Sequence, residues 1–447
     1  MLDKFRSALT AGLKMWGLQL NSEPWCTKEL AILADVGKKF PPRNTNNSNP
    51  QTTTSPSVMP SLYLFTSIVT LRTTAEDRAK NLKTAQLLAK FNRTPHVHES
   101  NGEVAALKYI HSVVQEHQQQ QQPLIDAVVG IVTDERQSRA VRWLVAECLK
   151  TGVLPILLPG ATSDKKQRLL CDNFRLNCTS KFSTDPIKGL DAGKEVPAIS
   201  GKSVLVVGID TCHTHDVTTG AVAGVLITPK GNHLLPSFWR NEIRGQELEQ
   251  VTQHFVQVIS KACDICGTLD EVVVFQDGNV FAELESMKAV VPRGTGLTFM
   301  CLHKRTNIRF VHKSQNQQNA ANVIKGTIIQ SLTPILSTAA ASGDDGTDAD
   351  KTRPPTSFYL QNHDCNMSTA RTVQYTVHAT SRTLDVSDVQ RLSFCLSHVA
   401  SPMPTKLPMS TRCAHKLSAV VERLVDACPD FKDSSIPKPL ANRLWFL

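Results

Sequence analysis

Two short apolar runs, each leading into an aspartate, constrain the fold of this 447-residue chain more than any other feature. Residues 204–209 lead directly into Asp210, and residues 272–275 are followed by Gln276 and Asp277. Apolar runs of this length, rich in β-branched residues and bounded by glycine, predict buried strands. A carboxylate at the end of a buried strand is held rigidly at the sheet edge. Two such carboxylates on neighbouring strands could share a pair of divalent cations, which would activate a water for phosphodiester cleavage.

Two further residues complete a candidate site with these aspartates. Glu247 lies in Gln-Glu-Leu, and His415 lies in Cys-Ala-His-Lys-Leu. Each residue alone also fits a structural role, because an aspartate before a loop commonly forms a turn or a cap. Gln-Asp-Gly is a common turn sequence, Glu247 fits an exposed helix position, and His415 fits a half-buried one. The spacing alone leaves both interpretations open.

Composition bounds the class of protein. The formal charge of +9 and the pI near 8.9 suit a polyanionic partner. The 12 cysteines are scattered, and the one CxxC, formed by Cys263 and Cys266, lacks the second pair of a zinc site, so we expect free thiols in a reducing compartment. No run approaches the roughly twenty apolar residues of a membrane span. We expect a cytoplasmic protein; a nuclear location and a mitochondrial presequence within residues 1–20 remain open.

The order of expected elements divides the chain into three parts. Residues 40–57 are rich in Pro, Asn, Thr and Ser, so we expect residues 1–58 to be a linker-like segment with a low-complexity tail. In residues 59–200, strands alternate with helices, which predicts a small parallel sheet. The expected strands are 62–71, 127–132 and 153–158, and the expected helices are 75–91, 104–114, 135–149 and 165–173.

Residues 201–447 form the third part, in which strands come first and helices last. Residues 337–355 are small and polar with an acidic cluster, so we expect a disordered insertion there. The expected strands are 203–209, 221–227, 271–275, 297–302, 308–310 and 371–377, and the expected helices are 246–262, 387–398 and 414–426.

Seven motifs in order resemble those of the Argonaute/PIWI family, and the last resembles its PIWI branch. They are Gly208-Ile209-Asp210 with His213, Gln246-Glu247, Phe275-Gln276-Asp277-Gly278, Asn322 to Thr327, Phe358-Tyr359-Leu360 with His363, Leu392 to His398, and Pro408 with Ala414-His415-Lys416-Leu417. The resemblance implies an α/β fold class, with a Rossmann-like MID domain followed by an RNase H-like PIWI domain. It implies also that the family's N-terminal and PAZ domains are missing, since about sixty residues precede the expected MID domain.

The resemblance also implies a chemistry. Asp210, Asp277 and His415 would be metal ligands, and Glu247 would be the fourth catalytic residue, with Glu242 as the alternative. Oxygen-rich ligation favours two Mg²⁺ or Mn²⁺ ions. The function implied is that of a divalent-metal-dependent endoribonuclease, a slicer in RNA silencing, that cuts a target RNA paired to a small guide RNA.

RNA contacts are implied at two places. The guide 5′-phosphate would be held by Arg142 and Lys181, and by the Leu447 carboxylate acting through a bound metal ion. Ser138 stands where the family has a stacking tyrosine, and the family's glutamine is absent. The RNA backbone would be contacted through charge alone, without reading of sequence. The residues implied there are Lys304, Arg305, Arg309 and Arg371.

Other functions stay open on sequence grounds. The first is a non-cleaving guide-RNA-binding protein that represses through protein partners. The second is an RNase H-like nuclease without a guide. For the leading interpretation we expect a monomeric ribonucleoprotein that does not bind membranes, with a protein partner as one way to supply the missing domains. All the candidate cations also fit ordinary surface positions.

Overall fold

The computed structural model describes a large part of the second of two compact units, Met1–Pro60 and Ser61–Leu447. No helix among the described residues is long and apolar enough to cross a membrane. The expectations for residues 1–58, for helices at 75–91 and 165–173 and for the insertion at 337–355 fall outside the described residues. These residues are 65–71, 97–100, 103–119, 127–132, 139–159, 181, 185, 187, 190–213, 217–241, 247–278, 282–312, 321–330, 356–363, 370–399 and 405–446.

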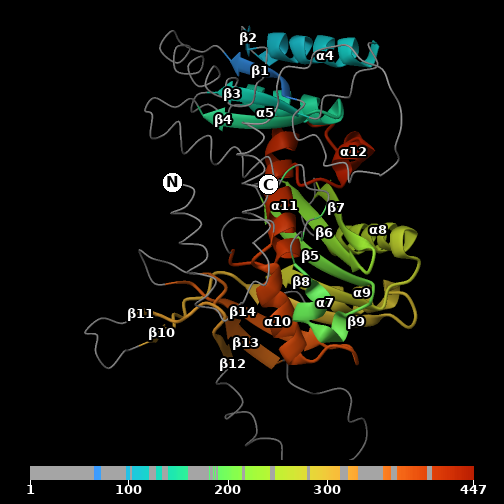
Figure 1. Ribbon diagram of the computed structural model, residues 1–447, viewed down its shortest axis with the longest axis vertical. Coiled ribbons are helices and arrows are strands. Elements are labelled where there is room, and N and C mark those ends of the chain that lie inside the picture. The colour runs from blue at the N-terminus through green and yellow to red at the C-terminus, as the bar shows by residue number, and fades with distance from the viewer. Residues whose placement is uncertain are drawn as a thin grey trace, which may run out of the picture. The chain divides into compact units, whose positions relative to one another are not determined.

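A four-stranded parallel sheet comes first in the chain, in the order β2-β1-β3-β4 (Figure 1). Two helices, α4 (Glu103–Gln119) and α5 (Arg139–Lys150), pack against each other through a small buried apolar cluster. The alternation of strand and helix therefore gives the parallel sheet that the sequence predicts. The strands are β1 (Phe65–Leu71), β2 (Val97–Ser100), β3 (Ala127–Val132) and β4 (Leu154–Pro159).

An eight-stranded mixed sheet follows, in the order β12-β13-β14-β9-β8-β5-β6-β7. Its three central strands, β9, β8 and β5, are parallel, and the remaining pairs are antiparallel. The strands are β5 (Val204–His213), β6 (Thr218–Thr228), β7 (Gly231–Asn241), β8 (Glu271–Asp277), β9 (Gly296–His303), β12 (Ile328–Gln330), β13 (Thr356–Leu360) and β14 (Val373–Ala379), and β10 (Val311–His312) and β11 (Ala321–Asn322) form a separate pair.

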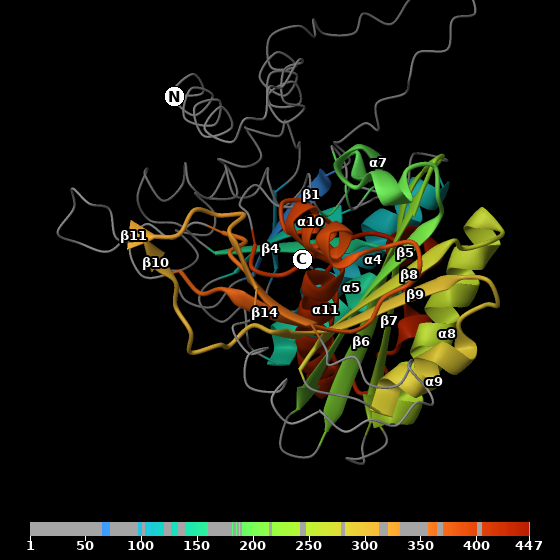
Figure 2. The ribbon, with the colours of Figure 1, turned by 90° about the horizontal axis from the view of Figure 1, so that it is seen from below.

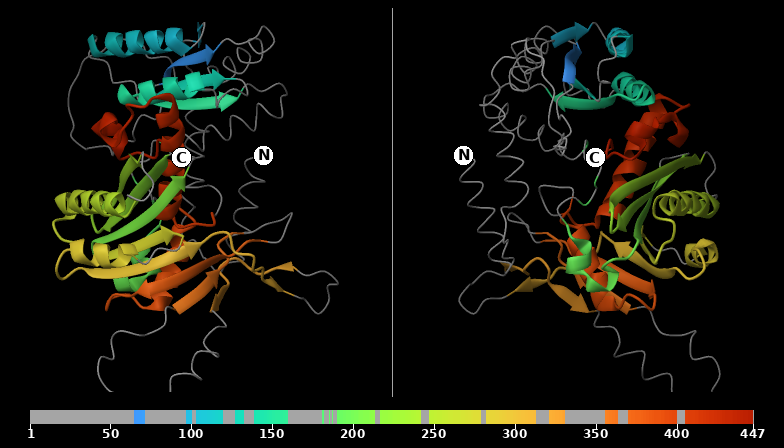
Figure 3. Two further views of the ribbon diagram at one scale, coloured as in Figure 1. Left: turned by 180° about the vertical axis from the view of Figure 1, so that it is seen from behind. Right: turned by 45° about the vertical axis from the view of Figure 1, so that its right-hand side comes forward.

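Helices cover both faces of this sheet, as Figures 2 and 3 show. On one face, α8 (Glu247–Cys266) and α9 (Ala282–Val290) bury the side chains that alternate along β5 and β8. On the other face, α10 (Val386–Leu396) and α11 (Met409–Ala427) bury the opposite set. Because both faces are covered, the central strands are apolar throughout, as is typical of buried parallel strands. The short helices are α7 (Ala192–Glu195), η2 (Pro197–Ile199), η4 (Asp433–Ser435) and α12 (Lys438–Ala441).

The structure corrects the sequence prediction in several places. Strand β7 is absent from the sequence prediction. It contains Pro236 and lies at the edge of the sheet, where proline is tolerated. Helix α9 was also missed. The prediction of a strand at 308–310 is wrong, because the structure has no strand at these residues and β10 begins at Val311. Helix α11 begins at Met409, five residues before the expected start, because Pro408 precedes its first turn and its fixed φ suits a helix start.

A close backbone approach fixes α11 on the sheet. A Cβ atom added at Gly208 in β5 would lie 2.2 Å from the carbonyl carbon of Ser410 and 2.3 Å from the backbone nitrogen of Thr411. Real Cβ atoms do not approach backbone so closely, so only glycine allows the first turn of α11 to lie directly on β5. Since β5 carries Asp210 and α11 carries His415, this contact sets the spacing between those two residues.

We expect Gly208→Ala to lower the free energy of unfolding by about 1–3 kcal/mol or more, because the backbone of α11 must move away from β5. Chemical denaturation measures this loss. Gly224→Ala in β6 is the matched control, since its added Cβ would meet mainly the tip of the Val258 side chain at 2.6 Å, on the opposite face of the sheet. A loss for Gly208→Ala no larger than that for Gly224→Ala would contradict the importance of the α11 contact.

Candidate metal centre

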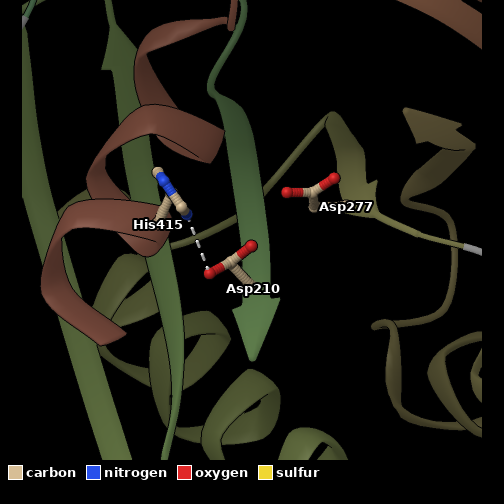
Figure 4. Close-up of side chains that lie close together, drawn as sticks. All are labelled: Asp210, Asp277 and His415. Carbon is tan, nitrogen blue, oxygen red and sulfur yellow. Dashed lines mark hydrogen bonds and ion pairs between the residues drawn. The ribbon is translucent and has the colours of Figure 1, made fainter. Parts of the chain in front are cut away.

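Asp210 and Asp277 lie on neighbouring parallel strands. Strand β5 pairs with β8 so that Gly208 is opposite Phe275 and Ile209 is opposite Gln276, which brings the next residues of both strands to the same edge. His415 reaches this edge from α11 (Figure 4). Each of the three residues offers a ligand atom, and these atoms all lie within 4.8 Å of one another. Three sequence-predicted site residues, separated by up to 205 positions, are thus brought together.

Asp210 is the most enclosed of the three, with 6% of its surface exposed. The Ser418 hydroxyl, one turn after His415 on α11, donates a 2.8 Å hydrogen bond to Asp210 Oδ2. His415 Nδ1 lies 3.2 Å from the same oxygen. The helix therefore supplies two groups that hold the Asp210 carboxylate in one orientation.

Lys304 places a positive charge inside this cluster. It follows directly after β9, and its ammonium forms an ion pair with Asp277 and lies 3.6 Å from Asp210 Oδ1. The same ammonium lies 3.3 Å from His415 Nδ1. Because Nδ1 can either donate to Asp210 or accept from Lys304, the tautomer of the His415 ring decides which of the two contacts is a hydrogen bond.

The pKa values of the two aspartates are shifted in opposite directions. Burial, followed by the neighbouring Asp210, raises the pKa of Asp277 to about 6. Burial also opposes the charge on Asp210, but hydrogen bonds with His415 and Asp277, the Lys304 charge and the Ser418 hydroxyl together hold its pKa below the usual value. Two carboxyl groups this close share their protons, as paired acids do in general.

The donor set fits a hard divalent cation. Two carboxylates and one imidazole converge at the sheet edge, and an additional positive charge close to them lowers their electrostatic cost. Oxygen-rich ligation with one imidazole suits Mg²⁺ or Mn²⁺. Among the described residues, no other group of three acidic, histidine or cysteine side chains has this arrangement.

A basic pocket of about 290 Å³ lies beside the acidic cluster and shares Lys304 and His415 with it. Its lining has four cationic side chains, one of which, Lys406, was missed in the sequence. The available signal was a lysine two residues before the Pro408 motif. The lining residues are Lys304, Arg305, Arg371, Lys406, Leu407 and His415.

Comparison with known proteins identifies the family. A sequence model of the Piwi domain matches residues 127–426, two thirds of the chain. The chain belongs to the Argonaute/PIWI family. None of the curated proteins compared with the chain matches it in sequence.

Solved structures share its fold. The C-terminal lobe of a budding yeast Argonaute superposes with a TM-score of 0.62 at 14% identity, over 85% of this chain and 84% of that one. Drosophila Piwi superposes with a TM-score of 0.56 at 13% identity, over 87% of this chain and 51% of that one. This chain therefore spans about half the length of Drosophila Piwi. The Piwi domain has an RNase H-like nuclease fold, a fold that typically uses divalent metals, and its family binds nucleic acid in silencing.

The remaining candidate residues of the Piwi-family chain lie in varied surroundings. The Arg142 guanidinium pairs with Asp426 at 3.2 Å, and the Lys181 ammonium donates to the Trp445 carbonyl at 3.2 Å. One terminal nitrogen of Arg309 donates to the carbonyls of Thr306 and Ile308 in its own loop, and Arg309 is not part of the pocket lining. Glu247 begins α8, but its side chain, all of Glu242 and Leu447 lie outside the described part of the Piwi-family chain.

The raised pKa of Asp277 predicts a pH dependence for the metal-free protein. Between about pH 4 and pH 6, folded Asp277 holds a proton that the unfolded chain has lost, so its contribution to stability is present at low pH and disappears as the pH rises through 6. Asp277→Asn removes this dependence. We expect the unfolding free energy of Asp277→Asn minus that of wild type to increase by roughly 1–3 kcal/mol from pH 4 to pH 7, measured by urea denaturation with chelator present. A difference that does not change with pH would show that Asp277 titrates normally.

Proposed function

We propose that this protein is a small-RNA-guided, divalent-metal-dependent endoribonuclease that acts in RNA silencing. The observation that carries the proposal is the convergence of Asp210, Asp277 and His415, with ligand atoms within 4.8 Å, beside a pocket lined by cations. Acidic ligands next to a phosphate-binding surface are the arrangement that metal-assisted phosphodiester cleavage requires.

Asp210, Asp277 and His415 would hold the metal ions. A bound pair of Mg²⁺ or Mn²⁺ ions supplies an activated water and stabilises the leaving oxygen. Ser418 keeps the Asp210 carboxylate oriented, and the fixed position of α11 keeps His415 beside it. Glu247, at the start of α8, is the proposed fourth catalytic residue.

The basic pocket would hold the RNA backbone. Arg305, Arg371 and Lys406 line it together with Lys304, and their charges would bind phosphates without reading the bases. Arg309, whose terminal nitrogen binds its own loop, would act beside the pocket rather than within it. We propose that the guide 5′-phosphate binds Arg142 and Lys181 directly and the Leu447 carboxylate through a bound metal ion. We also propose a cytoplasmic location for the protein.

A second candidate function is a guide-RNA-binding silencing protein that does not cleave. Two contacts favour it: the Lys304 ammonium occupies the acidic cluster, and Arg142 is engaged by Asp426. Ser138 also stands in place of the stacking tyrosine. Cleavage assays separate the two functions, since both require RNA binding.

We expect Asp277→Asn to abolish cleavage of a guide-paired target RNA, because a carboxamide is a poor ligand for a divalent ion, while RNA affinity measured without divalent ions changes less than about threefold. Gel-resolved cleavage with Mn²⁺ and filter binding measure the two properties on the same preparation. Ser260→Ala, at an exposed position of α8, is the control and should retain both cleavage and RNA binding. Wild-type protein that binds guide and target but leaves the target intact in Mg²⁺ and in Mn²⁺ would favour the non-cleaving function.

We expect the affinity for single-stranded RNA to fall steeply with salt, and the slope of log K against log [salt] to decrease by about 0.7 for each pocket cation removed. The variants are Arg305→Ala, Arg371→Ala and Lys406→Ala, tested singly and together. Lys288→Ala, an exposed lysine on α9, should leave the slope unchanged. An unchanged slope in the triple variant would show that RNA binds elsewhere.

A further inference from the structure

Lys304 belongs to two sites at once. Its ammonium contacts Asp277, Asp210 and His415, and its side chain also lines the basic pocket. Arg305 and Arg371, which also line the pocket, form no ion pair with either aspartate within the described part of the chain. Lys304 is thus placed between the acids that would bind metal and the surface that would bind phosphate.

The ammonium and a divalent ion compete for the same oxygens. A divalent ion held by Asp277 would take up the carboxylate that the Lys304 ammonium now contacts. Two cations cannot share that carboxylate closely, because a double and a single positive charge repel strongly in a half-buried site. The ammonium must therefore leave the acids when the metal enters.

The basic pocket is the place to which the ammonium can turn. Lys304 has a flexible four-carbon stem, 21% of its side chain is exposed, and it lines the pocket. The pocket already holds two arginines and a lysine, so a further positive charge is unfavourable there until an anion is present. A phosphate of the RNA backbone supplies that anion.

We propose that Lys304 is a built-in counter-cation that neutralises the Asp210–Asp277 pair until a divalent ion displaces it, and that the displaced ammonium then binds an RNA phosphate in the adjacent pocket. This inference rests on the proposed function and adds a coupling to it: metal favours RNA binding, and by linkage RNA favours metal binding to the same extent.

The test measures Mn²⁺ binding by the electron paramagnetic resonance signal of free Mn²⁺, so that no catalytic activity is needed. Without RNA, Lys304→Met should bind Mn²⁺ about tenfold or more tightly than wild type, because the competing charge is gone while the stem remains. Lys304→Arg keeps the charge and should remain close to wild type. Lys416→Met, which changes an exposed lysine next to His415, is the matched control and should also remain close to wild type.

A second measurement tests the coupling. A fully 2′-O-methylated single-stranded RNA, which resists cleavage, should raise the Mn²⁺ affinity of wild type but have little effect on that of Lys304→Met. Thermal melting in chelator should show Lys304→Met less stable than wild type, with Mn²⁺ restoring it, and this confirms that the variant folds.

The outcomes separate the inference from the proposed function. Equal Mn²⁺ affinity for wild type and Lys304→Met, with binding still lost in Asp210→Asn, would overturn the counter-cation role and leave a metal-dependent nuclease. Tighter Mn²⁺ binding in Lys304→Met without an effect of RNA would overturn the transfer to the pocket. Absence of any Asp210-dependent Mn²⁺ binding in all variants would overturn both the inference and the metal-dependent function.

Discussion

The contact of α11 with β5 at Gly208 is the constraint on which the candidate site depends. Parallel pairing of β5 with β8 places Asp210 and Asp277 side by side, but the pairing would bring together whatever residues stood at these two positions. His415 is added only because the backbone at Ser410 lies directly on Gly208, where a side chain would exclude it. The same helix then supplies Ser418 to orient Asp210. The absence of a side chain at Gly208 thus allows α11 to bring both His415 and Ser418 to Asp210.

The sequence predicts most of this arrangement, for reasons that differ between residues. Strands β3, β5 and β8 were predicted because buried strands are continuous apolar runs. Asp210 and Asp277 follow from their places at the ends of such strands, whereas His415 could be connected to them only through the family motif, since nothing local links a helix to a strand 205 residues earlier. Lys304 shows the limit: it was expected at the RNA backbone, and its contact with the acids depends on the order of β9 beside β8, which no local pattern reveals.

The acidic cluster and the cations of the basic pocket lie next to each other at the end of the sheet, and each lowers the electrostatic cost of the other. The acids are costly to bury together, as the raised pKa of Asp277 shows, and Lys304 lowers that cost in the metal-free protein. The pocket cations are costly to gather without an anion. An RNA phosphate and a divalent ion would relieve both costs together, so the metal-free, RNA-free protein is the state in which Lys304 is most needed between the acids.

Helix α11 also connects the candidate site to the first sheet. Asp426, eleven residues after His415 and thus about 16 Å along the helix, pairs with Arg142 on α5, and Lys150 at the end of α5 pairs with Asp430 just beyond α11. The Arg142 pair is partly exposed, and such pairs contribute only about 0–1 kcal/mol. A phosphate, which carries more negative charge than a carboxylate, could therefore displace Asp426 from Arg142. A guide 5′-phosphate that took Arg142 from Asp426 would act on the same helix that positions His415, so the proposed guide end and the candidate metal centre share one rigid element.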